Sequence, residues 1–168
     1  MDESAHHQTH NRGGIMILGI DPGASGGVAY KLPNSTAACF SMPETDGDLA
    51  GELSSMLDKL PAAVCYMEDL VKYTGRNMPS SAMAVYARNF GFIEGLLTGL
   101  DVKIIRVKPQ EWQKGLGLGT SRGGTKTEWK NKLKAEAQRL FPHLRRQITL
   151  KTSDALLILE YGMRKAKA

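Results

Sequence analysis

Apolar residues at the start of the chain fall into three short runs separated by turn residues. The first run, 15–20, is continuous and ends at Asp21, a pattern typical of a central strand buried on both faces. Two more runs, 26–32 and 36–42, flank a Pro-Asn-Ser turn at 33–35. Because tight turns join antiparallel neighbours, we expect these three strands to form a meander.

The rest of the chain alternates between helical and strand periodicity. The expected elements are a helix at 48–60, a strand at 62–68, a helix at 80–100, a strand at 102–107, a helix from the capping box Thr125-x-x-Glu128 to about Leu140, and a last helix from near Thr152. This order predicts an α/β fold. Its five-stranded mixed sheet has three antiparallel strands followed by parallel additions, with helices on both faces.

The helix at 80–100 carries Gly91, Gly95 and Gly99, whose four-residue spacing places them along one stripe. Three glycines cost a helix about 2–3 kcal/mol in total. We therefore expect a sheet or another helix to approach this stripe closely and offset that cost.

The chain has 168 residues, of which 42% are hydrophobic, and this fits one compact domain. Residues 1–14 lack apolar periodicity and a signal-peptide core, so we expect a disordered leader before a single domain at 15–168. No apolar run reaches the length of a membrane span. Cys39 and Cys65 fit strand cores, which favours a cytoplasmic setting in a bacterial or phage-infected cell and leaves an organelle open.

The net charge of +5, with most basic residues after residue 100, favours an anionic partner. A Gly-rich loop at 115–124 can bring backbone N–H groups close to phosphates, with Arg122, Lys126 and Lys130 beside it. Taken alone, the loop is equally well explained as a flexible linker.

Three acidic residues lie where a strand or helix pattern begins or ends. Asp21 follows the first strand, Glu68 ends the fourth, and Asp154 lies in the first turn of the last helix. If the first and fourth strands are neighbours, two of these acids meet at one sheet edge, and a helix over that edge can bring the third within reach. Each acid alone has an ordinary explanation, as a turn residue, a solvated strand end or a match to the helix dipole. Their joint placement favours a site.

Carboxylates clustered in a partly buried cleft are unfavourable unless cations neutralise them. Oxygen ligands select Mg²⁺ or Mn²⁺, and two such ions about 4 Å apart can activate a water and stabilise the leaving oxygen of a phosphodiester. The three acids therefore predict metal-dependent hydrolysis of nucleic acid, with two ions in each active site.

Five segments stand out together along the chain: Gly19-Ile20-Asp21-Pro22-Gly23, Gly26-Gly27-Val28-Ala29, Tyr66-Met67-Glu68, Val107-Lys108-Pro109-x-x-Trp112 and Ser153-Asp154-Ala155-Leu156-Leu157. They resemble the RuvC family of Holliday junction resolvases, especially its phage-like and organellar branches, and the segment that ends at Trp112 is similar to the organellar branch. The resemblance covers 15–162. It implies an RNase H-like fold and a homodimeric, Mg²⁺- or Mn²⁺-dependent crossover junction endonuclease of DNA recombination and repair, with no nucleotide cofactor.

In that family, each subunit nicks one of two opposed strands of a four-way DNA junction. The resemblance makes Asp21, Glu68 and Asp154 the metal ligands. It also places the helix that carries Gly91, Gly95 and Gly99 at the two-fold axis, so we expect this stripe to form the dimer contact.

One position departs from the family pattern. The family has a further acid or a histidine one helical turn before Asp154, where this chain has Lys151. Because residues three apart are neighbours on a helix, we expect Lys151 to point at the same site. It could pair with Asp154, contact the scissile phosphate, replace part of one metal's role or mark weakened catalysis.

Further basic and aromatic residues are candidates for DNA binding. Lys72, Tyr73 and Arg76 follow Glu68, where they could hold the backbone or stack on an unpaired base at the crossover. Lys108 lies at the exit of the fifth strand.

Three other functions compete with this interpretation. A sugar kinase or actin-like ATPase also opens with a strand that ends in Asp-x-Gly, but needs two such domains. A single-domain RNase H-like nuclease of pre-rRNA processing would cut RNA. A junction-binding protein whose catalysis failed with Lys151 would bind four-way DNA without cutting it.

Overall fold

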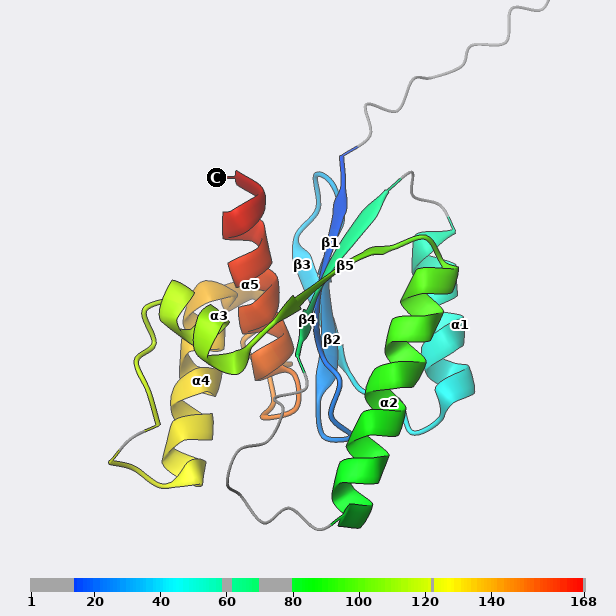
Figure 1. The fold of residues 1–168 in the computed structure, drawn as a ribbon. Coiled ribbons are helices and arrows are strands. Elements are labelled where there is room, and N and C mark those ends of the chain that lie inside the picture. The colour runs from blue at the N-terminus through cyan, green and yellow to red at the C-terminus, as the bar shows by residue number, and fades with distance from the viewer. Residues whose placement is uncertain (1–13, 59–61, 70–79, 122, 168) are drawn as a thin grey trace, which may run out of the picture.

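Five strands form one mixed sheet in the order β3-β2-β1-β4-β5 (Figure 1). They are β1 (Met16–Asp21), β2 (Gly27–Lys31), β3 (Ala37–Ser41), β4 (Ala63–Glu68) and β5 (Lys103–Val107). The first three strands pair antiparallel, whereas β4 pairs parallel with β1 and β5 pairs parallel with β4. The predicted meander and its parallel additions are confirmed. The computed structural model describes residues 14–58, 62–69, 80–121 and 123–167, so most of the expected leader lies outside the described residues.

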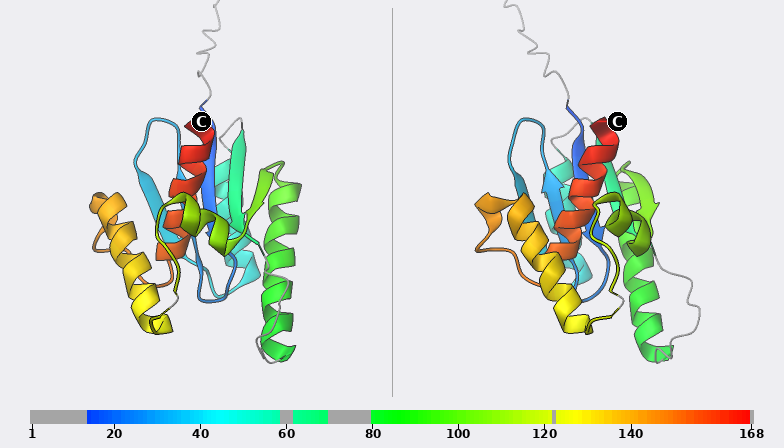
Figure 2. Two further views of the ribbon diagram at one scale, coloured as in Figure 1. Left: turned by 60° about the vertical axis from the view of Figure 1, so that its left-hand side comes forward. Right: turned by 90° about the vertical axis from the view of Figure 1, so that its left-hand side faces the viewer.

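Helices cover both faces of the sheet (Figures 1 and 2). One layer holds α1 (Asp46–Leu57) and α2 (Ser80–Gly99); the other holds α3 (Pro109–Gly115), α4 (Lys126–Leu140) and α5 (Ser153–Lys167), with a 3₁₀ turn at Pro142–Leu144. Each layer has its own buried hydrophobic cluster against the sheet. No helix in the described part of the chain is long and apolar enough to cross a membrane.

The side chains of β1 alternate between the two layers. Met16, Leu18 and Ile20 have no exposed surface and pack with α1 and α2. On the other face, a Cβ atom at Gly19 would lie 2.4 Å from backbone atoms of Ala155 and Leu159. This contact brings α5 directly onto β1, and it places the first turn of α5 beside the end of that strand.

Two short helical segments, α3 and the 3₁₀ turn, were not predicted from the sequence. In addition, α1 begins earlier than predicted. A proline opens both α3 and the 3₁₀ turn, because its fixed φ suits the first helical position. The Thr45 side chain accepts a hydrogen bond from the backbone N–H of Asp48, so α1 begins at Asp46, two residues earlier than predicted. The capping box at Thr125 is confirmed.

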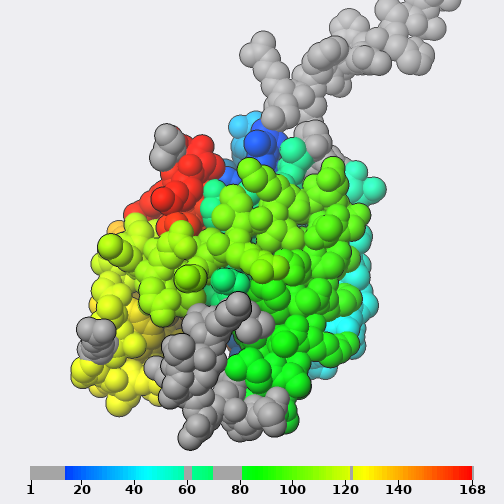
Figure 3. Space-filling view, in the orientation of Figure 1, coloured from blue at the N-terminus to red at the C-terminus, as the bar shows by residue number. Residues whose placement is uncertain are grey.

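Within the described residues no sheet or other helix approaches the glycine stripe, so the predicted close approach stays a prediction for a partner copy. An added Cβ at Gly91, Gly95 or Gly99 would have no heavy atom within 4 Å among the described residues. All three are exposed, because the buried face of α2 is formed by Phe90, Ile93 and Leu97. In the space-filling view α2, drawn in green, forms a large part of the surface (Figure 3).

Candidate active site

Asp21 and Glu68 lie side by side at the ends of two neighbouring strands. In the parallel pairing of β1 with β4, Ile20 is opposite Met67, so the next position along each strand carries a carboxylate. Oδ1 of Asp21 accepts a hydrogen bond from the backbone N–H of Gly23 over 3.2 Å. The structure therefore brings together the two acids that the sequence placed at one sheet edge.

The Glu68 carboxylate is held by a buried tryptophan. Nε1 of Trp112, which has no exposed surface, donates a hydrogen bond of 2.9 Å to Oε2 of Glu68. Burial, together with the negative charge of Asp21, raises the pKa of Glu68 to about 8, although the Trp112 bond opposes this shift. At neutral pH a nearby cation would therefore strongly favour the ionised carboxylate.

Asp154 reaches the same cluster from α5, where it is 5% exposed. Its Oδ2 forms an ion pair with Nζ of Lys130, and its Oδ1 accepts a hydrogen bond from Oγ of Ser153 over 3.3 Å. The sequence suggested Lys130 only as a charge beside the Gly-rich loop. The structure instead places its ammonium among the carboxylates.

The charges of Asp21, Glu68, Asp154 and Lys130 affect pKa values within the cluster. Burial raises the pKa of Asp21 and the charge of Asp154 raises it further, while the Gly23 hydrogen bond and Lys130 lower it. Burial alone would lower the pKa of Lys130, but the charges of Asp154, Asp21 and Glu68 outweigh it and raise that pKa. Among the residues that the structure describes, the cluster thus has three carboxylates and one ammonium within electrostatic reach, which leaves an excess of negative charge.

The oxygen atoms of the three carboxylates are of the chemical type that binds a hard divalent cation. Carboxylate oxygens are the ligands that Mg²⁺ and Mn²⁺ prefer, and the negative charge of the cluster favours such an ion. Among the described residues, however, no three acidic, histidine or cysteine side chains stand close enough to hold an ion between them. Two of the three carboxylates have other partners, because Glu68 is bound by Trp112 and Asp154 by Lys130.

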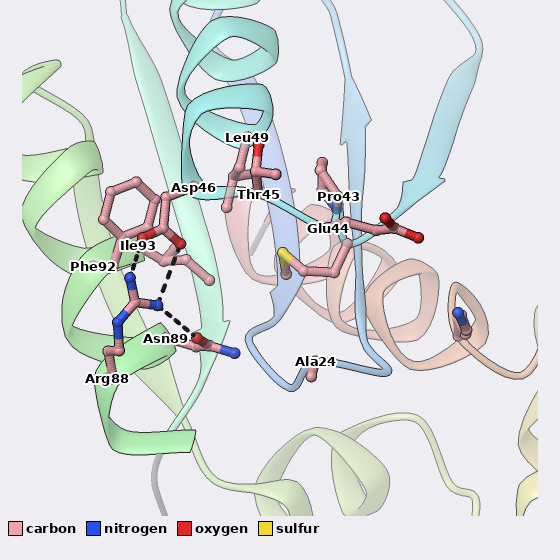
Figure 4. Close-up of a pocket in the computed structure, with 12 residues that line it drawn as sticks. Ala24, Pro43, Glu44, Thr45, Asp46, Leu49, Arg88, Asn89, Phe92 and Ile93 are labelled. Atoms are coloured by element: carbon pink, nitrogen blue, oxygen red, sulfur yellow. Dashed lines mark hydrogen bonds and ion pairs between the residues drawn. The ribbon is translucent and has the colours of Figure 1, made fainter. Parts of the chain in front are cut away.

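Lys151 lies in the turn before α5 and is exposed. It lines a hollow of about 190 Å³ whose walls come from the turn after β1, from the segment after β3, from α1 and from α2. In this hollow Arg88 of α2 pairs with Asp46 of α1 and has Asn89 beside it (Figure 4). Among the described lysines, it is Lys130 whose charge lowers the pKa of Asp21 and of Glu68.

The other predicted DNA-binding residues are only partly described. Lys108 precedes α3 and Lys126 is the first residue of α4, and both are exposed. Three of the predicted loop residues and one in the Gly-rich loop lie outside the described residues, namely Lys72, Tyr73, Arg76 and Arg122.

The described part of the Gly-rich loop is anchored to the core. Gly117 and Gly119 adopt positive φ values of 72° and 80°, which glycine accepts without strain. Between them, Leu118 is 6% exposed, and its carbonyl oxygen accepts a hydrogen bond of 2.9 Å from Nζ of Lys132. These contacts argue against a simple flexible linker.

Two aromatic residues at the site were not assigned a functional role from the sequence. From the sequence, Trp112 was named only in the segment that resembles the organellar branch, and its hydrogen bond to Glu68 gives it a role in orienting that carboxylate. The ring of Tyr86, on α2, lies 3.9 Å from the position of an added Cβ at Gly23. Burial, followed by the charges of Glu68 and Asp21, raises the pKa of the Tyr86 phenol, which therefore stays protonated beside the carboxylates. Nothing in the helical pattern distinguished Tyr86 from a core residue.

Known structures resemble this one over most of its length. Thermus thermophilus RuvC in complex with a Holliday junction substrate has a TM-score of 0.58 and 14% sequence identity, over 90% of this chain and 95% of that one. A second Thermus thermophilus RuvC structure gives 0.51 and 13%, with 90% and 95% covered. Fowlpox virus resolvase in complex with Holliday junction DNA gives 0.50 and 16%, with 89% and 99% covered. By sequence, no protein-family model and no curated protein matches the chain. The chain has the RNase H-like fold of the RuvC resolvases.

Proposed function

We propose that the protein is a structure-selective endonuclease that resolves Holliday junctions by paired, metal-dependent hydrolysis of phosphodiester bonds. The convergence of Asp21, Glu68 and Asp154 from β1, β4 and α5 carries this proposal. The fold supports it, because two of the similar structures are complexes with Holliday junction DNA.

In this proposal Mg²⁺ or Mn²⁺ binds at the carboxylates. A divalent ion held there would lower the pKa of a coordinated water and would stabilise negative charge on the phosphate. The protein positions the ligands: Trp112 orients Glu68, the Gly23 amide orients Asp21, and Ser153 donates to Asp154. The protonated phenol of Tyr86 is a hydrogen-bond donor near the same end of the sheet.

Contacts with DNA surround this site in the proposal. Lys108, just before α3, and Lys126, on α4, are exposed near the carboxylates, and Lys151 borders the neighbouring hollow. We assign these three to phosphate contacts, together with the loop residues Lys72, Tyr73, Arg76 and Arg122, whose roles rest on the sequence. Phosphate contacts of this kind position the protein on DNA without reading its sequence.

The same proposal includes a homodimer formed through α2. The exposed Gly91, Gly95 and Gly99 leave that helix open to a second copy, and close packing against a partner helix would offset their cost. A two-fold dimer carries two identical active sites, which matches the symmetry of a four-way junction.

A substrate panel tests the function. The protein is incubated with a labelled four-way DNA junction, a DNA duplex and a single-stranded RNA, in Mg²⁺, Mn²⁺ or EDTA. We expect cleavage of the junction alone, in either metal and not in EDTA. Cleavage of RNA alone would transfer the protein to the RNA-processing class, and tight junction binding without cleavage in any metal would make it a binding protein.

A further inference from the structure

The Lys130 ammonium is an internal cation of the carboxylate cluster. Nζ pairs with Oδ2 of Asp154, in a contact whose side chains are 33% and 7% exposed, respectively. Its charge also acts on Asp21 and Glu68. A lysine on the outer surface would have no such set of partners.

The helix that carries Lys130 is fixed on both sides of this residue. Before it, the capping box joins Thr125 and Glu128 reciprocally. After it, Lys132 donates to the carbonyl of Leu118, and Leu133 is 1% exposed in the core. The ammonium is therefore held at the cluster by a packed helix, and not by a loop that swings away at no cost.

The net charge of the cluster disfavours the binding of two divalent ions. Among the described residues, its three carboxylates and one ammonium carry a formal charge of −2, which a single divalent cation neutralises. A second divalent cation would leave a charge of +2 in a largely buried site, and it would also need an oxygen of Asp154 in place of Lys130. Both effects oppose its binding.

We propose that Lys130 takes the place of one of the two metal ions that the carboxylates would otherwise bind, so that each chain holds a single divalent cation at Asp21 and Glu68. Asp154 then acts mainly through Lys130, whose ammonium would supply positive charge to the reacting phosphate in place of a second ion. This inference rests on the proposed function, since it assumes that the cluster binds metal, and it replaces the two-ion expectation from the sequence.

Metal stoichiometry in DNA-free protein tests the inference. Mn²⁺ is titrated into the full chain by calorimetry, with free Mn²⁺ followed by electron paramagnetic resonance. We expect one ion per chain for the wild type. Lys130→Met, which keeps the apolar stem and removes the charge, should bind the first ion about tenfold more tightly and gain a second ion. Lys130→Arg, which keeps the charge, should still bind one ion.

The control is Lys134→Met, one turn further along α4, which removes the same charge from a partly exposed position. It should leave both the stoichiometry and the affinity as in the wild type. Two ions in the wild type would overturn the role of Lys130 while leaving metal-dependent cleavage intact. One ion in both the wild type and Lys130→Met would also overturn it. No Mn²⁺ binding at all would contradict the proposed function together with this inference.

Discussion

Nε1 of Trp112 donates a hydrogen bond to Oε2 of Glu68 over 2.9 Å, so a side chain with no exposed surface orients a carboxylate at the end of β4. The bond favours the charged form of Glu68, whose pKa burial and Asp21 raise to about 8. Trp112 is thus a core residue beneath α3 that also affects the ionisation of Glu68.

Replacing Trp112 with phenylalanine should weaken metal binding. Without the N–H donor the pKa of Glu68 rises further, so fewer molecules carry the carboxylate at pH 7, and Mn²⁺ affinity should fall several-fold. The free energy of unfolding should drop by about 1–3 kcal/mol, because a buried partner is lost. Trp129→Phe is the matched control, since Trp129 is only partly buried and packs beside Lys132. Equal losses of affinity in the two variants would refute a specific role for Trp112.

Gly19→Ala should destabilise the protein. An added Cβ would lie 2.4 Å from backbone atoms of α5, and backbone cannot yield as the end of a flexible side chain does. We expect α5 to be displaced from β1 at a cost of about 3 kcal/mol or more, measured by urea unfolding. Gly51→Ala, on α1 with no atom within 4 Å of the added Cβ, is the control and should be neutral or slightly stabilising. Equal stability of the two variants would mean that α5 does not contact β1 at Gly19.

The stability of the metal-free protein should fall as the pH rises from about 4.5 to about 8. Glu68 ionises near 4.5 when unfolded and near 8 when folded, so its contribution is complete below the lower value and is lost as the pH passes the higher one. The raised pKa of Asp21 acts in the same direction. Thermal unfolding in EDTA measures this as a falling Tm. Glu68→Gln should flatten the slope, and so should saturating Mg²⁺ in the wild type. A Tm that rises across this range would contradict the raised pKa.

Gly95→Leu should convert the proposed dimer into a monomer. An added Cβ at Gly95 has no heavy atom of another described element within 4 Å, so the fold should persist, while the longer leucine side chain would push away a partner helix packed against the stripe. Sedimentation equilibrium gives the mass of each variant. Gly51→Leu, also in an open helical position, serves as the control and should keep the mass of the wild type. A monomeric wild type would exclude the dimer altogether.

The sequence predicts the sheet well because its strands are short, apolar and separated by distinct turn residues. The continuous run that ends at Asp21 identified a central strand, and β1 does lie between β2 and β4. The short helix α3 was missed because seven residues are too few to show helical periodicity, although Pro109 after a strand marked its start.

The site was less predictable than the fold. Asp21, Glu68 and Asp154 were found because each stands at the end of an element, and element ends can be located from periodicity. The role of Lys130 was missed because it depends on how α4 packs against α5, and nothing local separates it from Lys126 or Lys134. Conversely, Lys151 was placed by helical spacing, whereas α5 begins only at Ser153 and Lys151 lies in the turn before it.

For the glycine stripe on α2, too, the local sequence did not predict the tertiary packing. Its four-residue spacing indicated correctly that Gly91, Gly95 and Gly99 share one face of a helix. Periodicity cannot tell which neighbour that face meets, and within the described chain the face is open.

Mapping of the nicks in a four-way junction shows whether the carboxylate cluster at Asp21 cleaves junction DNA. Each of the four strands is labelled in turn, and the junction is incubated with Mg²⁺ and either the wild type or Asp21→Asn, an isosteric change that removes one carboxylate charge. We predict nicks in two opposed strands at symmetric positions for the wild type and none for Asp21→Asn, with junction binding retained by both. Nicks that persist in Asp21→Asn, or junction binding by the wild type without nicks in Mg²⁺ or Mn²⁺, would contradict the account.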